Sequence, residues 1–435
     1  MTSRRIIVFG LLLGSLAGAL VTGRDLFYNL VYLWLSVIVI AALWTWTAIN
    51  RIRIGRHTRA LRAQVGRPLE ERLSVRNTSN VPKLWLEVRD HSDLPGHSAS
   101  LVVDSLGPMR ERVWVARTIC RERGRFRLGP LSLTSGDPFG LFQVTRQVPQ
   151  TTHIVVYPMT VDLPDFSLPL GPMPGGDALR RRTHYVTANA AGVRDYAPGD
   201  SFNRIHWAST ARRDRLIVKE FELDPLSDIW LFLDGDREVQ AGLPTPEPEQ
   251  VIVQGLWPTT HERGQVAPNT EEYGVTVTAS LAQYFARRDR TVGLVTYGRS
   301  REVVQPDRGE RQLTKILETL AVFRAEGRVR LADSLALESQ QLPRWSTLIL
   351  VTAAWDIGWV LSAQSLKRHG MRVVAVVLDQ ASFGGAHSAT LAVEALWSGG
   401  IPAFRVKNGD DLVTALSLGS WQAQRYSMGS EPAAV

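Results

Sequence analysis

The sequence GVRDYAPGDSFNRIHWASTARRDRLIVKE, residues 192–220, interleaves charged side chains with large apolar ones. The apolar and aromatic members are Tyr196, Phe202, Ile205, Trp207, Leu216, Ile217 and Val218. A solvated loop gains nothing from so many large apolar groups, so we interpret the stretch as a folded segment whose charges are held in place by packing. Pro198-Gly199-Asp200 predicts a tight turn, because Pro fixes φ and Gly admits the unusual one. The alternative is a basic surface loop that contains an aromatic residue by chance.

The spacing of these residues resembles the signature of the domain of unknown function 58 family. The pattern G-x-R-x-Y-x-x-G-D-x-x-x-R-I-H-W-x-x-x-A-R runs from Gly192 to Arg212, and LIVKEFE follows at 216–222. A second similar segment lies upstream, at residues 123–142. The resemblance covers residues 60–420 and implies these signature or partner-binding positions: Arg194, Tyr196, Gly199, Asp200, Arg204, His206, Trp207, Arg212, Lys219 and Glu220.

The composition is that of a globular protein with room for two or three domains, at 435 residues and 44% apolar. The single cysteine, Cys120, allows no intramolecular disulfide. The net charge of +8 comes mostly from arginines scattered among acids, which argues against a nucleic-acid partner. Local basic clusters occur at 51–62 and 180–182, and we assign the first to a membrane surface.

Two apolar runs near the start, residues 6–22 and 26–49, predict a transmembrane helical hairpin within residues 1–58. The connection between the runs is only Thr22-Gly23-Arg24-Asp25, whereas arginines precede the first run and follow the second. Because basic residues stay on the cytoplasmic side, we expect a two-pass protein of the cell membrane with both termini and the soluble domains cytoplasmic. The alternative for residues 1–22 is a cleaved signal peptide, which would leave the second helix as the anchor.

Residues 59–160 show short β-rich runs separated by turn residues. The predicted strands are LEERLSVRN, LWLEVRD, SLVVDS, RVWVARTICR, GRFRLGPLSLTS and HIVVYP. Regular short strands with Asn, Pro and Gly between them predict a small antiparallel β-sandwich. Residues 161–191 are interpreted as an irregular linker rich in Pro and Gly.

Residues 192–425 combine the signature with a run of alternating strands and helices. Strands are predicted at 227–236, 291–298, 346–352, 371–379 and 402–407, with helices at 272–289, 309–323, 357–369, 387–398 and from Asp410. Apolar strands that alternate with amphipathic helices predict a doubly wound α/β domain. We interpret residues 237–270 as an insertion or mobile loop and 426–435 as a flexible tail.

The resemblance implies that this last domain is von Willebrand A-like, a fold that often carries Mg²⁺ at a D-x-S-x-S motif after its first strand. The corresponding residues here are Asp234, Asp236 and Glu238, so carboxylates replace both hydroxyls. Three carboxylates suit a hard cation, and Thr296, Thr352 or Asp356 are candidates for further ligands. The alternative is that Asp234 caps a helix or binds backbone at the strand end.

No established catalytic motif occurs, including phosphate-binding loops, nucleophile elbows and zinc motifs. His206 is a candidate base if paired with Asp200 or Asp195, although a structural hydrogen-bonding role is the simpler interpretation. Trp207 is interpreted as a core anchor, with a partner-binding hot spot as the alternative.

These observations predict a non-enzymatic membrane-anchored adaptor. The resemblance implies a MoxR-type AAA+ ATPase as its partner, in the assembly or maturation of other proteins. The rival hypothesis is a metal-dependent hydrolase that uses the Asp, His and Arg residues of the signature together with a metal at Asp234. A third hypothesis is a structural protein of the cell envelope without an ATPase partner.

Overall fold

The computed structural model of the chain describes residues 3–164, 166, 190–196, 205–213, 215–221, 228–244, 266–343 and 346–417. Its contacts divide the chain into two compact units. The first is Met1–Met159 with the short segments Pro246–Val266 and Leu317–Val322, and the second is the remainder. Predictions for Gly199, Asp200, Arg204, most of the linker, the centre of the insertion and the tail lie outside the described residues.

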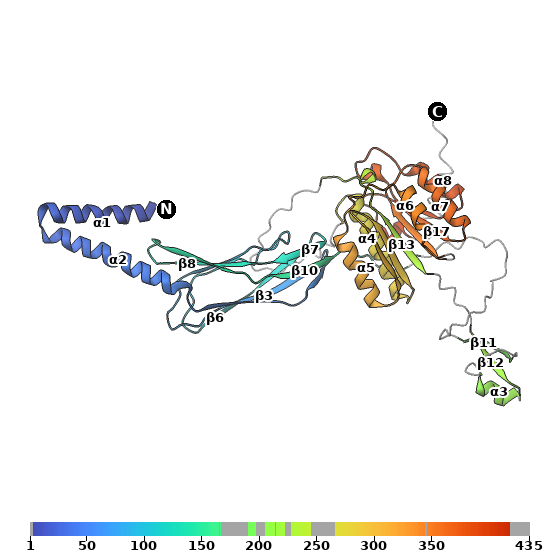
Figure 1. Cartoon of the computed structure of the whole chain (residues 1–435), viewed down its shortest axis with the longest axis horizontal. Coiled ribbons are helices and arrows are strands. Elements are labelled where there is room, and N and C mark those ends of the chain that lie inside the picture. Colours follow the sequence, from blue (N-terminus) through green and yellow to red (C-terminus); the bar gives the residue numbers. More distant parts are fainter. Residues whose placement is uncertain are drawn as a thin grey trace. The chain divides into compact units, whose positions relative to one another are not determined.

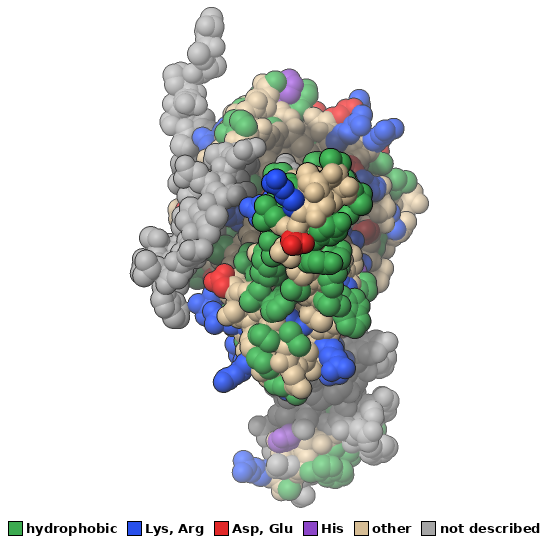
Figure 2. Space-filling model, turned by 90° about the vertical axis from the view of Figure 1, so that its left-hand side faces the viewer, with side chains coloured by type: hydrophobic (Ala, Val, Ile, Leu, Met, Phe, Trp, Pro, Cys, Tyr) green, Lys and Arg blue, Asp and Glu red, His purple; other side chains and the backbone are tan. Residues whose placement is uncertain are grey.

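The chain begins with two long apolar helices, α1 (Ser3–Thr22) and α2 (Asp25–Ile49). They lie side by side, joined by a turn at Gly23, whose φ of 63° favours glycine (Figure 1). Both are long and apolar enough to cross a membrane, and hydrophobic side chains cover most of their surface (Figure 2). The two helices suggest membrane anchoring, as the sequence predicts.

Three small sheets follow in the first unit. The first has the order β1 (Ile52–Thr58), β3 (Pro68–Asn77), β6 (Glu111–Ile119). The second has the order β5 (Leu101–Val103), β4 (Leu86–Asp90), β8 (Leu131–Gly136), β9 (Gln143–Val148). The third has the order β2 (Arg62–Gln64), β10 (Thr152–Tyr157), β7 (Gly124–Leu128), and only its β2–β10 pair is parallel.

The core of this β unit follows the two-residue period of its strands. In β3, the side chains of Leu69, Glu71, Leu73 and Val75 are buried, and the residues between them are not. Leu73 and Val75 pack with Leu86, Val88 and Leu133 of the second sheet. The β-rich prediction is therefore confirmed, with Glu71 as the one charged residue on the inward face of β3.

Three strands of this unit were not predicted: β1, β2 and β9. The assignment of the basic stretch 51–62 to a membrane surface is wrong for Arg56, which is buried in the β unit, and residues 52–58 of the stretch form β1. The predicted strand GRFRLGPLSLTS is two strands, β7 and β8, which are interrupted at Gly129-Pro130.

The second unit contains a six-stranded sheet. Its strands are β13 (Ile229–Asp234), β14 (Val292–Tyr297), β15 (Arg301–Asp307), β16 (Thr347–Thr352), β17 (Arg372–Leu378) and β18 (Ala403–Val406). The order in the sheet is β15-β14-β13-β16-β17-β18, with only β15 antiparallel. This is the strand order of doubly wound sheets, and it places the switch point between β13 and β16.

The helices of this unit are α4 (Thr270–Arg287), α5 (Glu310–Val322), α6 (Leu331–Glu338), α7 (Gly358–Arg368), α8 (Thr390–Ser398) and α9 (Leu412–Ala415). Figure 1 shows α4 on one side of the sheet and α7 and α8 on the other. The predicted alternation of strands and helices is confirmed, whereas β15 and α6 were not predicted.

Two short segments precede β13 along the chain. The signature forms a β-hairpin of β11 (Ala190–Asp195) and β12 (Ile217–Phe221), with α3 (Trp207–Arg213) between its strands. The described residues from 161 to 166 form no helix or strand, as predicted, but the Leu163 and Phe166 side chains are buried in the α/β unit, so this part of the segment packs and is not a free linker. The ring of Phe166 meets those of Tyr284, Phe285 and Phe404.

Candidate functional site

The switch point of the six-stranded sheet brings two polar side chains together. Asp234 ends β13, and Thr352 ends the neighbouring parallel strand β16. The Thr352 hydroxyl donates a hydrogen bond of 2.6 Å to Asp234 Oδ2, and the backbone N–H of Asp236 donates one of 3.1 Å to Oδ1. Gly235 permits this geometry, because a Cβ there would lie 2.3 Å from the carbonyl oxygen of Tyr297.

The carboxylates at this edge repel one another in a buried setting. Burial raises the pKa of Asp234 to about 6; hydrogen bonds from Thr352 and Asp236 oppose the rise, and the charges of Asp236 and Asp356 add to it. Burial also raises the pKa of Asp236, with the nearby Glu238 and Asp356 adding to the rise and Arg330 opposing it. Within the described ranges, no Lys or Arg forms an ion pair with Asp234.

The predicted ligands meet only in part. Asp236 is buried, and its Oδ1 accepts a 3.1 Å hydrogen bond from the backbone N–H of Glu238, which caps the short 3-10 helix η2 (Arg237–Val239). Glu238 is exposed, and the carboxylate oxygens of Asp234, Asp236 and Glu238 do not all lie within 4.8 Å of one another. Thr296 is in register with Leu233 rather than Asp234, so its side chain lies on the opposite face of the sheet.

The donors at the switch point fit a hard cation in chemistry, since all of them are oxygens and the buried carboxylate lacks a basic partner. Asp234, Asp236 and Thr352 are the buried residues that would hold it. Asp356 is exposed, as Glu238 is, and the carboxylate oxygens of Asp234, Asp236 and Asp356 do not all lie within 4.8 Å of one another. The bound cation would relieve the repulsion among the three carboxylates, which is the chemistry it would supply here.

Exposed large apolar side chains occur in the segments that follow the strands at this edge of the sheet, and we call them the apolar rim. Its large side chains, each at least 38% exposed, are Leu243, Trp355, Ile357, Leu361 and Leu391. They follow the carboxyl ends of β13, β16 and β17, and the Trp355 ring stacks on His387 with centroids 3.8 Å apart. Tryptophan in an exposed apolar patch is typical of a protein-binding surface.

The signature segment has a local network of its own. The ring nitrogen Nδ1 of His206 lies 2.7 Å from Ser209 Oγ and accepts a 3.1 Å hydrogen bond from the backbone N–H of Ser209, so His206 caps the start of α3. Asp195 pairs with Arg215 at 3.0 Å on the surface. Trp207 is 67% exposed, so its interpretation as a core anchor is wrong, whereas the alternative of a partner-binding position stays a prediction.

A second charged cluster lies inside the β unit. Arg56 Nη2 lies 3.1 Å from Glu71 Oε2 and 2.9 Å from Asp90 Oδ2. His97 Nε2 lies 3.1 and 3.0 Å from the same two oxygens, and all four side chains are at most 2% exposed. His97 Nδ1 lies 2.8 Å from the hydroxyl of Thr118, which fixes the ring.

These contacts set the charges of the buried cluster. Burial alone would raise the pKa of Glu71 and Asp90, but hydrogen bonds from His97 and the charge of Arg56 lower both below their ordinary values. Burial alone would lower the pKa of His97, but Asp90 and Glu71 raise it. The ligand atoms of Glu71, Asp90 and His97 lie within 4.8 Å of one another, yet Arg56 already supplies a cation to both carboxylates, so the cluster is better suited to a protonated His97 than to a metal.

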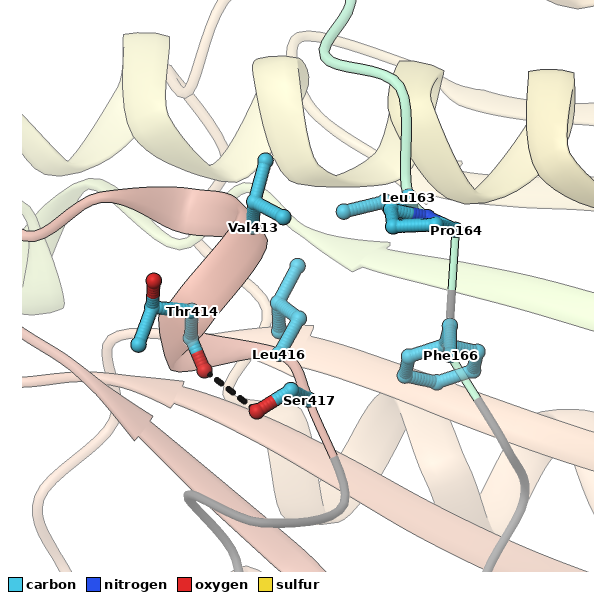
Figure 3. Close-up of a pocket in the computed structure, with 7 residues that line it drawn as sticks. All are labelled: Leu163, Pro164, Phe166, Val413, Thr414, Leu416 and Ser417. Carbon is cyan, nitrogen blue, oxygen red and sulfur yellow. Dashed lines mark hydrogen bonds between the residues drawn. The ribbon is translucent and has the colours of Figure 1, made fainter.

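A cavity of about 180 Å³ lies where the segment after β10 meets α9 (Figure 3). Leu163, Pro164 and Phe166 line one side, and Val413, Leu416 and their neighbours line the other. The lining residues include no ionisable group, so this cavity offers no catalytic chemistry. Both lining segments lead directly into residues outside the described ranges.

Residues 192–254, which begin with the signature hairpin, match the family described as Protein of unknown function DUF58. The match supports the DUF58 assignment that the signature predicts. A relative of this chain is the uncharacterized protein YeaD of Bacillus subtilis (strain 168), which is 21% identical over 315 residues and matches over 70% of each chain.

Solved structures similar to parts of this chain include the CARDB domain of the PF1109 protein from Pyrococcus furiosus, solved with di-metal ions. It is 17% identical and covers 24% of this chain and 91% of its own, with a TM-score of 0.19. The pilus adhesin SpaC from Lactobacillus rhamnosus GG is 12% identical and covers 46% and 30%, with a TM-score of 0.28. At these scores neither structure bears on the fold or function of the chain.

Two features of these sites were not predicted from the sequence, the buried cluster and the apolar rim. The buried cluster could have been recognised from Glu71, an acidic residue at an inward position of an alternating strand. The apolar rim could have been recognised from the AAWDIGW stretch at 353–359, which directly follows a buried strand.

Proposed function

We propose that this protein is a membrane-anchored, non-enzymatic adaptor that binds another protein at the carboxyl edge of its six-stranded sheet. The observation that carries the proposal is the buried Asp234 carboxylate at the switch point, bordered by the exposed apolar rim. A few precisely placed polar groups among apolar side chains are typical of ligand-binding sites.

The strand order and the carboxylates at the end of β13 support a von Willebrand A-like assignment of this unit. They also support Mg²⁺ as the cation held by Asp234 and Asp236, with Thr352 and Asp356 as further oxygen donors. Glu238 and Asp356 stay weaker candidates than the buried residues, because both are exposed.

The partner that the family resemblance implies is a MoxR-type AAA+ ATPase, and the location that the arginine distribution supports is the cytoplasmic face of the cell membrane. Such a partner would contact the apolar rim, and Trp355 is the residue expected to contribute most of the binding energy.

The metal is tested by thermal denaturation of the full-length protein in detergent, in EDTA and in Mg²⁺. With Mg²⁺ at 100 times its Kd, we expect the Tm of the wild type to rise by about 5 °C or more. Asp234→Asn is expected to abolish this rise, and to be at least as stable as the wild type in EDTA at neutral pH, because burial disfavours the charged carboxylate.

Two buried threonines at strand ends make a matched pair for this test. Thr352→Val removes the hydroxyl that contacts Asp234 and should reduce the Mg²⁺ effect, whereas Thr296→Val, on the other face of the sheet, should retain it. An equal Mg²⁺ effect in the wild type and Asp234→Asn would exclude a metal at Asp234.

The adaptor role is tested separately by measuring binding to a purified, nucleotide-free MoxR-type AAA+ ATPase. Trp355→Ala is expected to weaken binding at least about tenfold. Leu337→Ala, an exposed residue on α6, serves as the control and should bind like the wild type. Binding that Trp355→Ala leaves unchanged would remove the rim from the interface, and a turnover lost in His206→Ala would favour the hydrolase instead.

A further inference from the structure

The end of the β unit that follows α2 carries an unusual combination of exposed side chains. We define the proximal end as the turn 78–84, the turn 104–110, the turn 137–142 and the adjoining first residues of β1 and β6. Four arginines are exposed at or beside it, namely Arg51, Arg53, Arg110 and Arg112. Four large apolar side chains are exposed on its turns: Val81 at 38%, Leu84 at 38%, Met109 at 61% and Phe139 at 48%.

Covalent connection and hydrogen bonds place the proximal end next to the ends of the membrane helices. Only Asn50 and Arg51 separate α2 from β1. The backbone N–H of Thr78 donates a 2.8 Å hydrogen bond to the carbonyl of Arg51, and the Lys83 ammonium donates one to the carbonyl of Thr47 in the last turn of α2. Near the start of α1, the Arg5 guanidinium donates to the carbonyl of Leu141 and lies 5.5 Å from the Phe142 ring centroid.

One buried side chain fixes two of these turns relative to each other. Asn77 is fully buried, and its Nδ2 donates hydrogen bonds of 2.9 Å to the carbonyl of Val81 and 3.0 Å to that of Gly107. The turn carrying Met109 is further tied by a 3.3 Å bond from the Met109 N–H to the carbonyl of Ser79. The turns that carry Val81 and Met109 are therefore held together by hydrogen bonds.

Features of the backbone and the strand register at this end do not serve the fold itself. Met109 adopts φ 52°, which is uncommon for a residue other than glycine, while its side chain remains in the open. Arg53 and Arg76 lie directly opposite each other on β1 and β3, a like-charge pair that destabilises a sheet. Neither arginine has an ion pair among the described residues, although Glu111 of β6 lies directly opposite Arg76 on its other side.

We propose that the proximal end docks onto the bilayer that α1 and α2 cross, with its arginines on anionic lipid headgroups and its apolar tips in the interface. Anionic headgroups neutralise the opposed arginines, and the hydrocarbon boundary receives Met109 and Phe139. Of the carboxylates at the same end, Asp137 is buried and accepts the backbone N–H of Phe139, and the exposed Asp104 and Glu111 offset only part of the charge of the four arginines. The proposal rests on membrane insertion of the helices and is independent of the site at Asp234.

The test uses the full-length protein in nanodiscs of phosphatidylcholine, with or without phosphatidylglycerol, and lipids that carry a nitroxide quencher at the headgroup. An environment-sensitive fluorophore is attached to Met109→Cys or Phe139→Cys. The native Cys120 stays unlabelled, because it is fully buried and burial raises its pKa to about 11. Ile119→Cys is the control, since Ile119 is exposed and pairs with Pro68 at the other end of β3, about 30 Å from Asn77 along the strand.

We expect quenching at positions 109 and 139 to exceed that at 119 severalfold, and to increase with phosphatidylglycerol. Arg53→Glu combined with Arg112→Glu, checked for folding by circular dichroism, should remove the dependence on anionic lipid. Quenching at 109 no greater than at 119 would overturn the docking, and equal quenching in neutral and anionic discs would overturn the headgroup selection. A chain that does not enter nanodiscs at all would overturn both the anchoring and the docking.

Discussion

At the scale of single residues, the buried cluster of Arg56, Glu71, Asp90 and His97 makes the stability of the β unit depend on pH. The pKa of His97 is raised by folding, so its contribution is complete below the unfolded value of 6.5 and is lost as pH rises through the folded value. The pKa values of Glu71 and Asp90 are lowered, so their contributions are complete above 4.5 and are lost as pH falls through the folded values. The unit should therefore be most stable between about pH 5 and 6.5.

This prediction is tested by hydrogen exchange of the β3 amides between pH 5 and 9, corrected for intrinsic rates. His97→Gln is expected to cost about 3 kcal/mol near pH 6, because it leaves two buried carboxylates with one cation, and to flatten the dependence above pH 6.5. His57→Gln, on the exposed side of β1, is the control and should behave like the wild type. Protection of the wild type that stays constant from pH 6 to 9 would contradict a protonated His97.

The two acidic clusters differ at the level of individual charges. Glu71 and Asp90 share two cations from their own chain, whereas Asp234 has only hydrogen-bond donors among the described residues. The first arrangement is complete as it stands and acts on stability, and the second leaves charge to be neutralised from outside. For this reason we place binding at Asp234 and not at the buried cluster.

At the scale of elements, the segment after β10 belongs to the α/β unit. Phe166 is 2% exposed, and its ring centroid lies 5.6–5.9 Å from those of Tyr284, Phe285 and Phe404. We expect Phe166→Ala to lower the free energy of unfolding of this unit by about 3–5 kcal/mol, because it removes a buried aromatic ring and enlarges the adjacent cavity.

Chemical denaturation of the full-length protein in detergent measures this cost. Leu337→Ala removes a side chain that is 58% exposed and should change the stability by no more than about 0.5 kcal/mol. A Phe166→Ala variant as stable as the control would mean that residues 161–166 behave as the linker that their composition suggests.

Elements were predictable where one signal dominated. Helices α1 and α2 and the parallel strands β13, β16 and β17 are continuous apolar runs, and the sequence predicts each of them within a few residues. β1 was not predicted because its arginines interrupt the alternation of apolar and polar residues. Arg56 can be buried because Glu71 and Asp90, which lie on two other strands, form ion pairs with it. β15 and α6 lack a clear apolar period.

The candidate site was likewise predictable only in part. The position of Asp234 at a strand end follows from the sequence, but the choice of Thr352 over Thr296 depends on which strand faces which side of β13. That register is a tertiary property, and no local pattern encodes it. The stacking of Trp355 on His387 likewise joins two loops that only the folded sheet brings together.

At the scale of the whole molecule, the distribution of arginines predicts which side of the membrane the soluble units occupy. Arg4 and Arg5 begin α1, and Arg51 and Arg53 follow α2, whereas the turn between the helices carries only Arg24 beside Asp25. Arg56 is buried and does not count toward this comparison, but the flanks of the hairpin next to the β unit still carry more positive charge than the turn between the helices. We therefore expect the turn to face outward and both soluble units to face the cytoplasm.

Labelling of intact cells with a membrane-impermeant maleimide tests this orientation. Arg24→Cys should react in intact cells, and Leu61→Cys, which is exposed after β1, should react only after the cells are permeabilised. The wild type gives the background, because Cys120 is fully buried and burial raises its pKa to about 11. Reaction of Leu61→Cys in intact cells would place both soluble units outside, and a cytoplasmic AAA+ ATPase would then be excluded as the partner whatever binds at Asp234.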